Sequence, residues 1–225
     1  MQELPGRTRL RGERKYLMLE LYAADTPNGH RAAIMLEEMS LAYDLKVVDV
    51  FKGEAATPEM LALNGRGRVP VLVDHDAAEG RNVVTQSWVI ALYLAEKTGM
   101  FIPADKAGKR VVAEWLFHVA SDVMMVHSTL NAVTNFVPEK VASTIDFYEK
   151  RLLGLLKNLD THLSTSDYLA GEVTIADFGL YPIYNFRRAF IAAHASALAH
   201  LARWGERMDA RPGCVRGVSV IKERR

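Results

Sequence analysis

The sequence predicts a protein of two parts, a small α/β domain followed by an all-α helical domain. Up to about residue 100, short β-type runs alternate with helical patterns in the order β-α-β-α-β-β-α. Beyond that point apolar residues recur at helical spacing and no further strand pattern is found. Because a strand, a helix and a strand follow one another at the start, we expect a βαβ unit with parallel strands.

The elements expected in the α/β domain, residues 17–100, follow from strand runs and amphipathic patterns. They are a strand at 17–23, a helix at 30–39, a strand at 43–50, a short helix at 57–64, strands at 68–74 and 81–85, and a helix at 86–99. The polar turn HDAAEG separates the last two strands, which is typical of an antiparallel hairpin. The final helix is apolar on nearly every side, so we expect it to be buried.

The helical domain is expected to cover residues 106–215. Its predicted helices lie at about 106–131, 139–163, 175–186 and 196–210, and Pro212 and Gly213 are expected to end the last one. Residues 216–225 are then predicted to form a C-terminal tail. Residues 1–16 carry five basic groups and few apolar ones, which predicts a disordered tail, with a nucleic-acid-binding arm as the alternative.

Composition narrows the function classes. The chain has 225 residues, 49% hydrophobic residues and a net charge of +1, which suits a protein with a sizeable core and predicts neither nucleic acid nor a membrane as partner. We find no membrane-length apolar run and no signal-peptide core. The single cysteine, Cys214, excludes an internal disulfide and favours the cytoplasm. The histidines show no metal-binding spacing, so no metal is expected.

The turn DTPNGH stands between the first strand and the first helix. Thr26 could cap the helix with Pro27 at its first position, or Asn28 could cap it with Gly29 relieving the turn. The same residues suit a binding site, because a helix N-terminus leaves backbone N–H groups unpaired and attracts anions. A Thr hydroxyl and an Asn amide add two donors, which suits a ligand thiolate.

Three further motifs have both structural and functional interpretations. In RVPVLVD, Pro70 could simply begin a strand in trans, or a cis Val69–Pro70 bond could turn the backbone of Val69 towards an extended peptide ligand. In VVTQSW, Thr85 or Ser87 could cap the next helix, or Ser87 and Gln86 could hold a carboxylate and an amino group. In GEVTIADF, the spacing of Thr174 and Asp177 predicts a structural capping box.

Taken in this order and spacing, the motifs resemble those of the glutathione transferase superfamily. The resemblance covers Leu17 to about Val215, and GEVTIADF matches the family's helix-capping motif. It implies a thioredoxin-like N-terminal domain, an all-helical C-terminal domain, glutathione as co-substrate and a homodimer. It also implies that Pro70 is cis, that Val69 pairs with the cysteinyl part of glutathione, and that Gln86 and Ser87 hold its γ-glutamyl end.

The opening turn is similar to those of the bacterial nu-class and fungal Ure2-like members, which share a [TS]-P-N-G motif. This resemblance implies that Thr26 and Asn28 approach the glutathione sulfur and stabilise its thiolate. Similar proteins often place His or Gln after the second strand to bind the glycine carboxylate of glutathione, whereas this chain has Ala55 and Ala56. Lys52, Arg66 or Arg68 could substitute, and Arg68 is favoured because it adjoins Val69.

The second substrate is harder to predict, because the helical segment ASDVMMVHSTLNAV departs from the nu-class pattern. We expect Met124, His127 and Asn131 to line its pocket. The expected protein is an enzyme that joins glutathione to electrophiles or reduces disulfides or peroxides. The alternative is a glutathione-binding or protein-interaction module with little catalysis.

Overall fold

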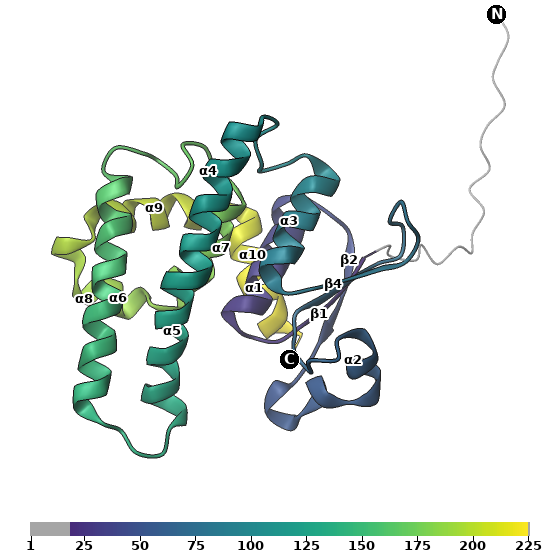
Figure 1. Ribbon diagram of the computed structural model, residues 1–225, viewed down its shortest axis with the longest axis horizontal. Coiled ribbons are helices and arrows are strands. Elements are labelled where there is room, and N and C mark those ends of the chain that lie inside the picture. The colour runs from purple at the N-terminus through teal and green to yellow at the C-terminus, as the bar shows by residue number, and fades with distance from the viewer. Residues whose placement is uncertain (1–18, 225) are drawn as a thin grey trace, which may run out of the picture.

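The first domain is built on a four-stranded sheet with the strand order β2-β1-β3-β4 (Figure 1). The computed structural model describes residues 19–224, so the basic segment 1–16 and the first two residues of the predicted strand lie outside the described part. The strands are β1 (Leu19–Ala23), β2 (Tyr43–Val47), β3 (Val71–Asp74) and β4 (Asn82–Thr85). β1 pairs with β2 in parallel, and β3 pairs antiparallel with both β1 and β4. The predicted βαβ unit and hairpin are therefore confirmed.

Helices cover both faces of this sheet. They are α1 (Pro27–Glu38), α2 (Pro58–Leu63) and α3 (Ser87–Thr98), with 3-10 turns at Val50–Lys52 and Glu54–Ala56. Side chains of β3 alternate between the faces, since successive residues of a strand point in opposite directions. Leu72 belongs to the large core that includes α1 and α3, whereas Val71 and Val73 pack with Met60 of α2. All four residues of β3 are consequently buried.

The second domain is helical, as expected. Its helices are α4 (Lys106–Phe117), α5 (Met124–Asn131), α6 (Ala142–Leu163), α7 (Ile175–Phe186), α8 (Arg188–Ala193), α9 (Ala199–Asp209) and α10 (Pro212–Glu223). The helix predicted over 106–131 is continuous, but it passes through a π-helical segment at His118–Val123 and ends in another at Ala132–Phe136. None of the helices within residues 19–224 has the length and apolar character needed to span a membrane.

The predicted capping box at the start of α7 is confirmed. Thr174 Oγ1 accepts from the N–H of Ala176 (3.4 Å), and Asp177 Oδ2 accepts from the N–H of Thr174 (2.9 Å). The other carboxylate oxygen, Oδ1, accepts from the N–H of Leu169 (3.0 Å) and from Trp204 Nε1 (2.9 Å). Asp177 therefore joins the start of α7 to the preceding loop and to α9, inside the core.

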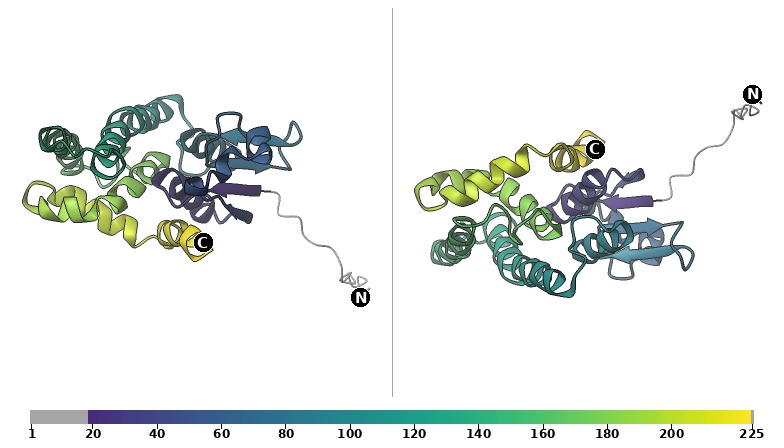
Figure 2. Two further views of the ribbon diagram at one scale, coloured as in Figure 1. Left: turned by 90° about the horizontal axis from the view of Figure 1, so that it is seen from below. Right: turned by 90° about the horizontal axis from the view of Figure 1, so that it is seen from above.

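The predicted C-terminal tail is wrong, because α10 occupies residues 212–223. Pro212 stands at the first turn of α10, where its missing N–H has no helical partner to lose, so it starts a helix instead of ending one. α10 returns to the first domain and lies along α1 in all three views (Figures 1 and 2). A Cβ on Gly217 would lie 2.5 Å from Cα of Ile34, so glycine permits this close approach. Cys214 is accordingly buried in the fold and does not lie beyond the last helix.

Candidate functional site

Three segments that are distant in sequence meet at one end of the sheet. Val71, the first residue of β3, pairs with Tyr22 near the end of β1 and with Thr85 at the end of β4. The chain just after β1, just before β3 and just after β4 therefore lies at the same edge. These segments carry the motifs TPNG, Val69–Pro70 and Gln86–Ser87. Thus the sheet register brings together most of the residues that the sequence singled out.

Thr26 caps α1, which confirms the first of the two capping alternatives. Its backbone is extended, Pro27 follows at the first helical position, and Thr26 Oγ1 accepts from the N–H of Gly29 (3.2 Å). The N–H of His30 donates to the carbonyl of Thr26 (2.9 Å). Because Pro27 has no N–H, Asn28 contributes the remaining backbone donor at this helix end, and no hydrogen bond within residues 19–224 uses it. The helix end therefore offers a donor at its positive pole.

The side chain of Asn28 is linked to the start of α3. Asn28 Oδ1 accepts from Arg31 Nη1 (2.7 Å) and, over a longer distance, from Ser87 Oγ (3.4 Å). Ser87 Oγ also accepts from Arg31 Nη1 (2.7 Å). Ser87 is buried and Asn28 is half-buried, so the contact runs from the interior to the surface of the site.

Of the two interpretations of Thr85, Gln86 and Ser87, the structure excludes capping of α3. Neither Thr85 nor Ser87 caps this helix; the cap position is Gln86, which makes no side-chain capping bond. The hydroxyl of Ser87 is engaged by Arg31 instead. Gln86 has a φ of 71°, a left-handed conformation that is uncommon for a residue other than glycine and that recurs at functional sites. Its side chain is exposed beside Ser87.

The Val69–Pro70 peptide bond is cis, as the resemblance implied. Pro70 is buried and Val69 is half-buried. Asn64 Nδ2 donates to the carbonyl of Arg68 (2.7 Å), which ties the loop before β3 to the end of α2. Arg68 itself is exposed next to Val69.

The other two candidate cations have different surroundings. Lys52 pairs with Asp49 (3.3 Å) in the 3-10 turn after β2. Arg66 lines a shallow depression over α3 and β4, together with Gln86. Of the three, only Arg68 adjoins Val69 in the chain.

Family comparisons cover both domains. Residues 26–97 match the profile "Glutathione S-transferase, N-terminal domain", and residues 111–212 match "Glutathione S-transferase, C-terminal domain". The disulfide-bond oxidoreductase YfcG of Escherichia coli (strain K12) is 32% identical over 211 residues, which cover 91% of this chain and 95% of YfcG. The chain belongs to the glutathione S-transferase superfamily.

Other members of the superfamily agree in sequence and in fold. The disulfide-bond oxidoreductase YghU of E. coli is 30% identical over 88% of this chain and 73% of its own length. Glutathione transferase URE2P6 from Phanerochaete chrysosporium, solved with oxidized glutathione, superposes with a TM-score of 0.85 at 27% identity, covering 92% of this chain and 98% of that one. A glutathione transferase family member from Pseudomonas fluorescens, solved with two glutathione bound, superposes with a TM-score of 0.84 at 25% identity. The match covers 92% of this chain and 94% of that one. The thioredoxin-like and helical domains are thereby confirmed.

A fully buried arginine lies at this edge of the sheet and was not predicted. Arg31 has no exposed surface, and burial lowers its pKa to about 9, so it remains charged at neutral pH. The sequence does contain a signal for it. Arg31 lies four residues before Met35, on the helix face that carries the predicted apolar residues, and a charge on such a face needs an explanation.

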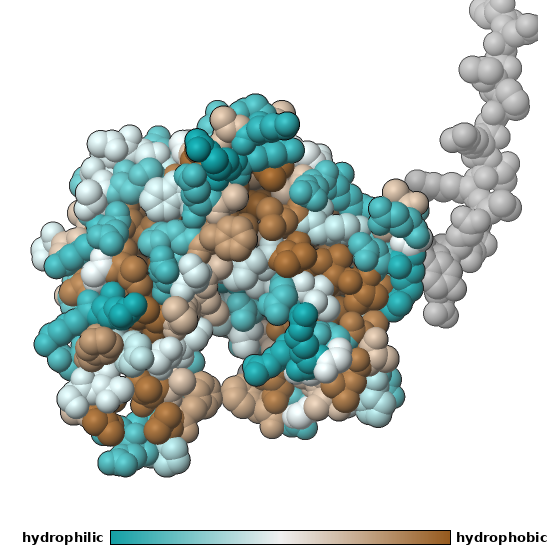
Figure 3. Space-filling view, viewed as in Figure 1, coloured by the Kyte–Doolittle hydropathy of each residue, from teal (hydrophilic) through white to brown (hydrophobic). Residues whose placement is uncertain are grey.

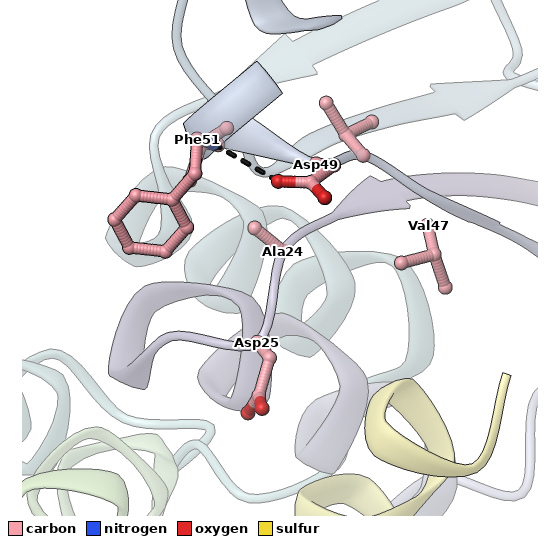
Figure 4. A pocket seen from close by; sticks show the side chains of 7 residues that line it. Ala24, Asp25, Val47, Asp49 and Phe51 are labelled. Atoms are coloured by element: carbon pink, nitrogen blue, oxygen red, sulfur yellow. Dashed lines mark hydrogen bonds between the residues drawn. The ribbon is translucent and has the colours of Figure 1, made fainter. Parts of the chain in front are cut away.

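A small pocket adjoins the turn that leads into Thr26 (Figure 4). It lies between the end of β1 and the 3-10 turn after β2, with walls that include Ala24, Phe51 and two carboxylates that point in different directions. Asp49 Oδ1 accepts from the N–H of Phe51 (3.0 Å). Asp25 Oδ1 lies 2.9 Å from Nε2 of the buried His30. The contact of Asp25 with His30 ties the turn to α1.

The residues expected to line the second-substrate pocket differ in exposure. Met124 and Asn131 are half-buried, and Asn131 Oδ1 accepts from Asn135 Nδ2 (2.8 Å). His127 is buried, with its Nδ1 accepting from Arg187 Nε (3.1 Å). Burial, Arg187 and Arg31 lower the pKa of His127 to about 3, so this imidazole is neutral at neutral pH. Within residues 19–224 no group of His, Cys, Asp and Glu is suited to hold a metal ion.

Proposed function

We propose that this protein binds glutathione at the N-terminus of α1 and stabilises its thiolate for the reduction of disulfides. The observation that carries the proposal is the convergence of Thr26, Asn28 and Ser87 at the edge of the sheet, beside a helix N-terminus. Two relatives are named disulfide-bond oxidoreductases, and solved structures of similar fold hold glutathione.

The physical basis is the ionisation of the thiol. A free thiol has a pKa of about 8.5, and a helix N-terminus with added donors lowers it, so that more thiolate is present at neutral pH. Thr26 Oγ1 already accepts from Gly29, which leaves its proton for a ligand; its other contact, to the carbonyl of Ala24, is long at 3.5 Å. Asn28 contributes its backbone N–H and its amide. These groups are poor nucleophiles but good donors to a sulfur anion.

The remaining site residues receive proposed roles along the rest of the ligand. We assign the backbone of Val69, before cis-Pro70, to the cysteinyl part, and Gln86 and Ser87 to the γ-glutamyl end. For the glycine carboxylate we propose Arg68, because it is exposed and adjoins Val69, whereas Lys52 already pairs with Asp49.

The reaction requires no protein cysteine. The bound thiolate attacks one sulfur of a disulfide, which breaks the S–S bond, forms a mixed disulfide and releases one thiolate. A second glutathione thiolate then attacks the glutathione sulfur of the mixed disulfide, giving glutathione disulfide and the second thiolate. Cys214, the single cysteine, is buried against α1, and burial raises the pKa of its thiol. The same bound thiolate could attack an electrophile or a peroxide.

Turnover of hydroxyethyl disulfide with glutathione tests the proposal. We expect activity well above buffer, and a loss of about 10- to 100-fold in kcat/KM for Thr26→Ala, because one donor to the thiolate is removed. Thr26→Ser is the matched control, since it keeps the hydroxyl, and should retain most of the rate. An aryl halide assay run in parallel measures conjugation. Calorimetric binding of glutathione without turnover in either assay would favour a binding module, and no binding would exclude both functions.

We further propose that two copies form a symmetric dimer. Hydrophobic side chains gather over α3 and β4 on the face shown in Figure 3, where Val83, Val89 and Leu92 line the shallow depression. Val89 is 48% exposed, which makes it an apolar side chain of α3 that a partner could cover. Light scattering should give twice the chain mass. Val89→Glu should shift the mass towards the monomer, whereas Val215→Glu on α10 should not; a monomeric wild-type protein would contradict the proposal.

We also propose a cytoplasmic location, on the basis of the cysteine content. One buried cysteine and no disulfide suit a reducing compartment. Fractionation of the source cells with an antibody to the protein would test this.

A further inference from the structure

Arg31 is the most unusual charged residue in the described part of the chain. Its guanidinium has no exposed surface, and each nitrogen donates to a neutral oxygen. Nε and Nη2 donate to the carbonyl of Gly179 (3.2 Å each), and Nη1 donates to Asn28 Oδ1 and Ser87 Oγ (2.7 Å each). The ring of Trp88 lies 3.7 Å from its central carbon. No carboxylate pairs with Arg31 among residues 19–224.

These contacts determine how the Asn28 amide is turned. A guanidinium can only donate, so the Asn28 atom that Nη1 contacts must be the oxygen. The amide nitrogen Nδ2 therefore points away from Arg31. Among residues 19–224 no hydrogen bond uses Nδ2. Because every fully buried side-chain nitrogen and oxygen there has a partner, Nδ2 must retain some exposed surface. Arg31 thus turns the two N–H donors of Asn28 out of the protein.

A purely structural role does not explain this arrangement. Taking an unpaired charge out of water costs several kcal/mol, and an apolar side chain of similar volume usually stabilises such a position at least as well. The fold also makes room for the cation. A Cβ on Gly179 would lie 2.3 Å from the Trp88 ring, so glycine at this position of α7 allows Trp88 and Arg31 to stack.

We propose that Arg31 is a positioning residue that holds the Asn28 amide with Oδ1 inward and Nδ2 outward, and whose uncompensated charge stabilises the anion that binds in front of Asn28. The inference rests on the proposed function, since the anion is the glutathione thiolate. Ser87 Oγ accepts from the same Nη1, and its own proton makes only a long contact with Asn28 Oδ1 (3.4 Å), so it can turn to the ligand carboxylate. Arg31 would then align the donors for both ends of the γ-glutamyl-cysteinyl unit.

The groups around Arg31 do not compete with it near neutral pH. α3 contributes Ser87 and Trp88, and α7 contributes a backbone carbonyl, none of which titrates there. α5 contributes His127, which burial and the two arginines Arg187 and Arg31 keep neutral. Arg187, which holds His127, adds further positive charge. Arg31 therefore keeps its positive charge near neutral pH, where the thiolate is proposed to form.

Thiolate absorbance of bound glutathione, titrated by pH, tests the inference in the full-length protein. We expect Arg31→Met to raise the thiol pKa by about one unit, which corresponds to about a tenfold loss of thiolate and of kcat at low pH. Arg31→Lys keeps the charge but not the planar fork, and should give a smaller rise. In a protein that already carries Asn28→Ala, Arg31→Met should raise the thiol pKa by less than it does in the wild-type background. The reason is that a positioning residue acts through its partner.

Arg211→Met is the matched control. Its guanidinium also packs over aromatic rings, Phe101 and Phe178, but pairs with Glu38 (2.5 Å), so this variant should leave the thiol pKa unchanged. The role proposed for Arg31 would be wrong if the wild-type protein lowers the thiol pKa and a folded Arg31→Met or Arg31→Lys variant lowers it equally. Full additivity with Asn28→Ala would exclude positioning. If wild-type protein itself neither binds glutathione nor lowers its pKa, the proposed function fails first.

Discussion

Replacing Asn28 by alanine is expected to lower kcat/KM for disulfide reduction about 100-fold. The amide that Arg31 turns outward is lost, and with it the side-chain donors closest to the end of α1. The loss should appear mainly at low pH, because the thiol pKa rises and less thiolate forms. A pH profile of kcat for the wild type and the variant measures this, and both should approach the same rate at high pH.

The variant Asn28→Asp separates the effect of residue 28 on the thiolate from its effect on the stability of the fold. A carboxylate at this position would pair with Arg31 and so preserve or raise the stability of the fold, but it would repel the thiolate. We therefore expect Asn28→Asp to be slower than Asn28→Ala although it is at least as stable. Asn158→Ala, at an exposed position of α6, is the control and should keep the full rate. Equal rates for Asn28→Asp and the wild type would rule out donation from Asn28 to an anion.

Replacing Asp177 by alanine should have the largest effect on stability. Four donors converge on this carboxylate: the N–H groups of Leu169 and Thr174, the hydroxyl of Thr174 and Trp204 Nε1. All would lose their acceptor inside the core, so we expect the free energy of unfolding to fall by about 3–5 kcal/mol. Urea unfolding, followed by tryptophan fluorescence at one fixed protein concentration, measures the change.

The control for Asp177 is Asp122→Ala. Asp122 lies 2.8 Å from His118 on the helical surface and is half exposed, so its loss should change the unfolding free energy by less than about 1 kcal/mol. Asp177→Asn should also destabilise the protein, because an amide nitrogen would face some of the donors. A fall of similar size for Asp122→Ala and Asp177→Ala would contradict the special role of this buried acceptor.

Local chemistry in the sequence predicted much of the site. The order TPNG, Val69–Pro70, Gln86–Ser87 indicated one binding edge, and the register of the sheet brings these segments together. Thr26 as a cap and Thr174 with Asp177 as a capping box were predictable because each involves residues within three positions of one another. The spacing of apolar residues that predicts strands and helices likewise involves only residues that are close in the sequence.

Long-range contacts explain what the sequence did not predict. Arg31 meets Ser87 and the carbonyl of Gly179, which are 56 and 148 positions away, so no local pattern reports its role. Ser87 contacts Arg31 and does not cap α3, which excludes one of the two interpretations that the sequence left open. Pro212 is equally compatible with ending a helix and with starting one, and the packing of α10 on α1 decides between them.

The sequence alone therefore determined the two-domain class, the element order and the caps, since backbone preferences and apolar periodicity act over a few residues. Tertiary structure decided which way Asn28 points and where the C-terminal residues pack. Both depend on contacts between elements. Ser87 of α3 and the carbonyl of Gly179 in α7 hold the guanidinium of Arg31, which can only donate to Asn28, and Gly217 lets α10 approach α1 closely.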